Sequence, residues 1–156
     1  MFAVEGLAFA IVFSFVIVLI HYESLRVISG IAEQAPISPR LKLLTVIVGV
    51  VAAHMLEAGV FAIGYWLGAE KLDFGKFVGD IPNSAFQYYY FALETYTTQS
   101  VGDVYPVGGL RVMASLEPLV GLILIGWSTS LTFVLMRRYW RAEPLVRPPQ
   151  RSDPSP

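Results

Sequence analysis

Three long apolar stretches, separated by shorter polar segments, dominate the pattern of the sequence. They cover residues 3–20, 43–67 and 112–136. None shows the polar stripe of a surface helix, and each is rich in leucine, valine and isoleucine. The second and third stretches are 25 residues long, which as a helix is roughly 37 Å and exceeds the ~30 Å hydrocarbon core of a bilayer. The pattern therefore predicts three membrane-spanning helices.

Composition agrees with a membrane location and excludes several classes of protein. Hydrophobic residues make up 55% of the chain and charged residues 15%, whereas soluble domains average about 45–50% and about 25%. A formal net charge of −1 gives no basic field, so we expect no nucleic-acid partner. With no cysteine the chain has no disulfides, and its two histidines alone cannot complete an ordinary zinc site.

The connections between the spans predict the orientation. Eight of the eleven Lys and Arg residues lie in the connection 23–42 or in the tail 137–156. Basic residues are retained on the cytoplasmic side, so we expect a multi-pass protein of the cell (inner) membrane with its N-terminus outside and its C-terminus in the cytoplasm. Helix 1–22 forms the first span, although its helix can continue to the break at Ala35-Pro36. The Pro-rich tail is predicted to be disordered and close to anionic lipid.

The segment between the second and third spans has the pattern of a re-entrant loop. A polar turret, 68–83, precedes an aromatic-rich stretch, 84–97, which Ser84 can cap and which is too short to cross a bilayer. It leads directly into the polar sequence TTQSVGDVYP. Non-helical backbone at membrane depth is tolerated only where it is buried in protein or lines a water-filled path. We therefore expect a half-helix at 84–97 followed by a pore loop.

This segment resembles the tetrameric pore-loop potassium channels of the bacterial two-span type. In that family the loop reads T-T-V-G-Y-G-D-x-x-P. An ungapped comparison matches Thr97, Thr98, Gly102, Asp103 and Pro106 to it, and places Glu94 where some members have a carboxylate that pairs with the aspartate. With one deletion after Pro106, Gly121 falls on the hinge glycine of the inner helix.

The resemblance implies an all-α integral membrane protein with three transmembrane helices, in which four identical copies surround a cation path. The pore domain would cover 43–136, with outer helix 43–67, pore helix 84–97, filter 98–103 and inner helix 110–136. The only bound metal implied is K⁺ or Na⁺ in the filter, held by the carbonyls of Thr98, Gln99, Ser100, Val101 and Gly102.

The centre of the motif departs from the family. Gln99, Ser100 and Val101 replace its valine, first glycine and tyrosine. Pointing successive carbonyls inward requires left-handed dihedrals at alternate positions, and a serine there costs on the order of 1–2 kcal/mol per chain. We therefore expect weakened potassium selectivity. The alternative is a non-conducting assembly or regulatory subunit with a channel fold, and an unknown regulatory partner stays open.

Ionisable residues inside the predicted spans need partners. His54 and Glu57 are three residues apart and share a helix face, so we expect a hydrogen bond between them, with a proton-sensing or metal role as the alternative. For Glu117 the expected partners are Arg111 of another chain, the back of the pore helix, or a carbonyl freed by Pro118.

Two further expectations concern enzymatic chemistry and the glycines of the third span. A membrane metalloenzyme would recruit His21 with His54, but a first span ending near residue 22 puts these two residues half a span apart. We therefore expect no enzymatic activity and no cofactor. Gly121 is either a gating hinge or, with Gly126, a packing notch between helices.

Overall fold

The computed structural model describes residues 2–79 and 85–142. The predicted cap Ser84 and the tail residues 143–156 lie outside the described residues. The elements in chain order are α1 (Phe2–Gln34), α2 (Pro39–Glu70), β1 (Gly75–Gly79), α3 (Ala85–Tyr96), β2 (Val104–Gly108) and α4 (Leu110–Ala142).

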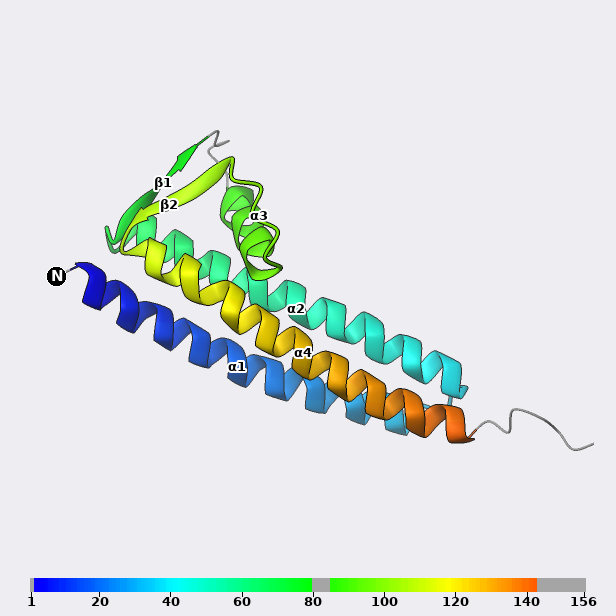
Figure 1. The fold of residues 1–156 in the computed structure, drawn as a ribbon. Coiled ribbons are helices and arrows are strands. Elements are labelled where there is room, and N and C mark those ends of the chain that lie inside the picture. The colour runs from blue at the N-terminus through cyan, green and yellow to red at the C-terminus, as the bar shows by residue number, and fades with distance from the viewer. Residues whose placement is uncertain (1, 80–84, 143–156) are drawn as a thin grey trace, which may run out of the picture.

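Three long helices lie side by side and form most of the molecule (Figure 1). Helices α1 and α4 run in the same direction and α2 runs the opposite way, while α3 and the two strands gather at one end of the bundle. All three long helices are long and apolar enough to cross a membrane, so the prediction of three candidate spans is confirmed. Large apolar side chains remain exposed along each of them, as expected for helices that face lipid or other chains.

Helix α1 is longer than the expected span 1–22. It continues to Gln34 because nothing before Pro36 breaks the hydrogen-bond ladder. Helix α2 then begins at once, with Pro39 in its first turn and Ser38 as its N-cap, whose side chain accepts from the Leu41 backbone N–H at 3.5 Å. The expected connection 23–42 is thus mostly helix, and His21 lies in the middle of α1.

Helix α4 also exceeds its expected bounds, 110–136. It continues to Ala142, so residues 137–142 are helical and do not belong to a disordered tail. In this extension Arg138 forms an ion pair with Glu33 near the end of α1.

A two-stranded antiparallel sheet was not predicted from the sequence. It pairs β1, which precedes α3, with β2, which follows the loop after α3. The register pairs Gly75 with Gly108 and Gly79 with Val104. Glycine is needed at Gly79 because its φ is +134° and an added Cβ would lie 2.0 Å from the Asp103 carbonyl oxygen. The sheet therefore fixes the start of β2, directly after the predicted filter, against the turret.

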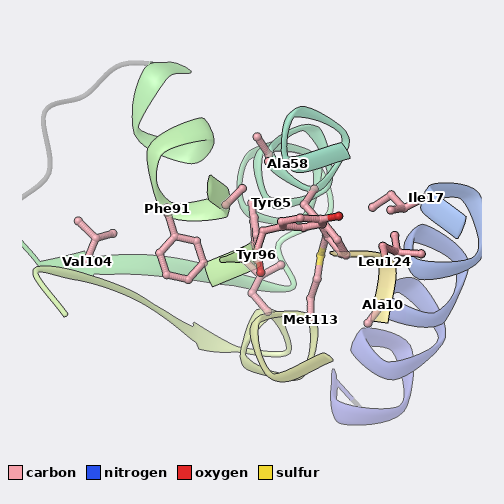
Figure 2. Close-up of a cluster of buried hydrophobic side chains, with 13 residues drawn as sticks. Ala10, Ile17, Ala58, Tyr65, Phe91, Tyr96, Val104, Met113 and Leu124 are labelled. Atoms are coloured by element: carbon pink, nitrogen blue, oxygen red, sulfur yellow. The ribbon is translucent and has the colours of Figure 1, made fainter. Parts of the chain in front are cut away.

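The main apolar core lies where α3 meets the long helices (Figure 2). Tyr65 from α2, Phe91 and Tyr96 from α3, and Met113 from α4 are buried together there. The rings of Tyr65 and Phe91 meet edge to face, with centroids 5.1 Å apart. This packing holds α3 firmly against α2 and α4.

Candidate functional site

Helix α3 descends from one end of α2 to its middle. Near the start of α3, Tyr88 donates a hydrogen bond to Glu70 at 2.7 Å. At its end, Tyr96 donates to Glu57 Oε2 at 2.5 Å. Glu70 and Glu57 are thirteen positions apart, which corresponds to roughly 20 Å along a helix. The C-terminal end of α3 thus lies about halfway along the bundle.

The loop that follows α3 has an alternating backbone. Thr98, Ser100 and Gly102 have φ values of +63°, +43° and +84°, so every second residue is left-handed. Alternation of this kind lets successive carbonyls face one side of the chain. The residues from Thr97 to Asp103 are exposed in the single chain, so the loop is free to face a common axis or another molecule.

Two short-range hydrogen bonds close the end of α3 before this loop. The backbone N–H of Thr98 donates to the Thr95 carbonyl at 3.0 Å, and that of Gln99 donates to the Glu94 carbonyl at 2.8 Å. They bind carbonyls of the last turn, which lack partners within the helix. The start of the loop is therefore fixed to α3.

Glu94 and Asp103 both lie near Tyr90. Glu94 is buried near the end of α3, and its hydrogen bond to Tyr90 raises the pKa of that phenol, with smaller contributions from burial and from the charge of Asp103. Both carboxylates therefore act on the same tyrosine. Pairing of Glu94 with Asp103 stays a prediction.

Gly121 lies where α4 passes the end of α3. A Cβ at this position would be 2.3 Å from the Tyr96 carbonyl oxygen, whereas one at Gly126 would meet nothing within 4 Å. Gly121 therefore permits close packing between α4 and the residue before the loop. This supports the packing interpretation for Gly121, and the gating hinge stays a prediction.

A buried polar cluster, formed by His21, His54, Glu57 and Tyr96, lies at the end of α3, where the loop begins. Glu57 Oε1 is 2.8 Å from His21 Nδ1, and Glu57 Oε2 is 3.1 Å from His54 Nδ1. Tyr96 Oη lies 2.8 Å from His54 Nδ1, in addition to its bond to Glu57. The predicted bond between His54 and Glu57 is confirmed, but it is one part of a larger network.

The expectation that His21 lies half a span from His54 is wrong. Their rings stack with centroids 5.3 Å apart, because α1 continues to Gln34 and brings His21 to mid-bundle. Ser128 of α4 adds a contact of 3.3 Å to His21 Nε2. The sequence offered one missed signal: extending the first helix to the break at Pro36 places His21 at the depth of His54.

Glu117 forms a second buried pair, with a partner that was not predicted. Tyr65 donates to Glu117 Oε2 at 2.5 Å, and both residues are fully buried. Within the part of the chain that the structure describes, Glu117 Oε1 has no hydrogen-bond partner. The expected bond to a carbonyl freed by Pro118 is therefore wrong, and within the chain α2, not the pore helix, supplies the partner.

Comparison with protein-family models, curated proteins and solved structures finds no match to this chain. The fold and the site alone define its class: a chain with three helices long and apolar enough to cross a membrane, and with a short helix that ends at mid-bundle in an exposed, alternating loop.

Proposed function

We propose that the chain is the subunit of a cation channel, in which four copies surround a common axis and the loop 97–103 lines the ion path. The observation that carries the proposal is the left-handed backbone at every second residue, Thr98, Ser100 and Gly102. Stacked rings of backbone carbonyls are the ligands that replace the hydration shell of a potassium ion. One loop supplies a quarter of each ring, so the proposal requires a tetramer.

The position of α3 supports the same reading. Its twelve residues reach roughly 18 Å, too little to cross a bilayer, and its C-terminal end lies at mid-bundle. A helix C-terminus carries partial negative charge, which favours a cation near the bilayer centre. We therefore assign α3 as a re-entrant pore helix.

Selectivity between potassium and sodium is proposed to be weak. Ser100 adopts its left-handed φ despite a Cβ, at a cost on the order of 1–2 kcal/mol per chain. Val101 has no phenol ring to brace the loop from behind. A strained, weakly braced loop holds its carbonyls less firmly at the spacing that favours one ion.

Flux through the purified chain in liposomes tests the proposal. We expect passive entry of both K⁺ and Na⁺, with at most a few-fold preference, and a sharper preference for K⁺ in Ser100→Gly/Val101→Tyr. Ser100→Ala/Val101→Tyr is the matched control, because it restores the ring but keeps the Cβ. Strong rejection of Na⁺ by the unmodified protein contradicts the strain argument.

The second candidate function is a non-conducting assembly or regulatory subunit with a channel fold. The strained Ser100 favours this second candidate. Glycine adopts a left-handed φ without strain, so a conducting loop is expected to have glycine at this position. An assembled tetramer that passes no ion in liposomes supports this candidate and overturns the first.

A further inference from the structure

We propose that His21, His54 and Glu57 form a binding site for a divalent transition-metal ion of the zinc class. Each residue offers one ligand atom, and these atoms all lie within 4.8 Å of one another. His21 comes from α1, whereas His54 and Glu57 are three positions apart on α2. The inference goes beyond the proposed ion path and does not depend on it.

The donor set suits zinc. Two imidazole nitrogens and one carboxylate oxygen are a recurring zinc ligand set, with metal–ligand distances of ~2.0–2.2 Å that place tetrahedral ligands ~3.3 Å apart. In the cluster, Nδ1 of each histidine lies 2.8 Å or 3.1 Å from a Glu57 oxygen. To accept the ion, these two separations would widen by roughly a few tenths of an ångström. The three ligand atoms lie within 4.8 Å of one another, so the widest pair would move closer by up to about 1.5 Å.

The three proposed ligands have hydrogen-bond partners that would orient them around a metal ion. His21 presents Nδ1 to Glu57, while its Nε2 lies 3.3 Å from Ser128 Oγ. A metal on Nδ1 leaves Nε2–H to donate to that hydroxyl, and such contacts orient histidine ligands at metal sites. Tyr96 Oη, 2.5 Å from Glu57 Oε2, is placed to orient the carboxylate or to supply the fourth oxygen.

Charge and access also favour a cation. His21 and Glu57 are completely buried, so an ionised Glu57 places a negative charge in an apolar environment, which is costly without compensation. The side chain of His54 is 17% exposed. It lines a cavity of about 420 Å³ between α2 and α4 that also reaches Ser128. His54 is therefore the ligand of the cluster that is accessible from outside the chain.

Metal binding to the tag-free, full-length protein in detergent tests the site. Dialysis against zinc chloride should leave one zinc ion per chain, and cobalt chloride should give the visible absorption of four-coordinate Co²⁺ with nitrogen ligands, which added zinc removes. Bound zinc should also raise the thermal unfolding temperature, because it binds the folded state preferentially.

Variants assign the site. His54→Gln and Glu57→Gln should each weaken zinc binding at least ~10-fold, whereas Glu117→Gln, a buried carboxylate outside the cluster, should bind zinc like the unmodified protein. Equal binding by His54→Gln and the unmodified protein would show that zinc lies elsewhere and overturn the proposal.

If a variant fails to fold, measurements on the unmodified protein still test the metal site. Absence of saturable zinc uptake and of the cobalt spectrum overturns the metal site and leaves a hydrogen-bonded network only. Zinc uptake by a protein that passes no ion supports the site while the channel proposal fails, so the two failures are distinguishable.

Discussion

At the scale of single residues, two glycines of α4 have opposite surroundings. A Cβ at Gly121 would overlap the Tyr96 carbonyl, whereas one at Gly126 would project into open space. Gly121→Ala should therefore lower the free energy of unfolding by about 1–3 kcal/mol through overpacking. Gly126→Ala should be neutral or stabilise by up to about 1 kcal/mol, since alanine favours helix.

Thermal unfolding of both variants in detergent measures the difference. Because Gly121 touches the residue that leads into the loop, its variant should also change ion flux. Equal unfolding temperatures for the two variants would contradict the close approach.

The pair Tyr65 and Glu117 allows a second residue-level prediction. Among the described residues, 2–79 and 85–142, Tyr65 is the only hydrogen-bond donor to the completely buried carboxyl group of Glu117. Tyr65→Phe should therefore cost about 1–3 kcal/mol of stability. Glu117→Leu should make a further Tyr65→Phe change nearly neutral, because no carboxyl group is then left without a donor. Thermal unfolding of the two single variants and the double variant gives the coupling energy, and strict additivity would show that the hydrogen bond contributes nothing.

Some site residues could be predicted from the sequence and others could not. The difference is how far apart along the chain the contacting residues lie. His54 and Glu57 are three positions apart, and helical periodicity alone placed them together. His21, Tyr96 and Tyr65 reach their partners across separations of 36 to 52 positions. The hydrophobic pattern of the sequence does not predict such contacts. They depend on the lengths of the helices and on how far each helix is shifted along the bundle relative to the others.

At the scale of elements, the sequence predicted the three long helices and the short helix, because long apolar runs and a short aromatic run have distinct signatures. It missed β1 and β2. Each strand has only five residues, and glycines occupy both ends of β1 and one end of β2, so neither shows a clear alternation. Their pairing depends on the close approach of two backbones, as at Gly79 and Asp103.

The attachment of α3 to the end of α2 predicts a dependence on alkaline pH. Burial and the hydrogen bond to Glu70 raise the pKa of Tyr88 from 10.0 to about 12. The folded state thus favours the neutral phenol, so its contribution to stability is complete below about pH 10 and is lost as the pH rises through about 12.

Thermal unfolding between pH 9 and pH 12 checks this expectation. Tyr88→Phe should remove part of the loss of stability above pH 10, whereas Tyr22→Phe, an exposed tyrosine of α1, should leave the profile unchanged. Identical profiles for Tyr88→Phe and the unmodified protein would contradict the role of this contact in holding α3.

At the scale of the whole molecule, the two ends of the bundle differ in their content of basic residues. The two-stranded sheet and the start of α3 lie at one end of the bundle, and the α1–α2 connection and the end of α4 lie at the other (Figure 1). Arg40, Lys42, Arg137 and Arg138 belong to the second end. The fold thus brings together basic residues that lie in two separate segments of the sequence.

This asymmetry leads to a prediction of orientation. Basic residues are retained in the cytoplasm, so the α1–α2 connection should lie inside and the turret outside.

The chain has no cysteine, and single cysteines therefore report position without background. In intact cells, Ser38→Cys and Ser152→Cys should be protected from a membrane-impermeant thiol reagent, whereas Asp73→Cys should react; Ser152 lies outside the described residues. Permeabilised cells, in which all three should react, provide the control. Labelling of Ser38→Cys from outside would contradict the proposed orientation, and with it the placement of the turret outside the cell.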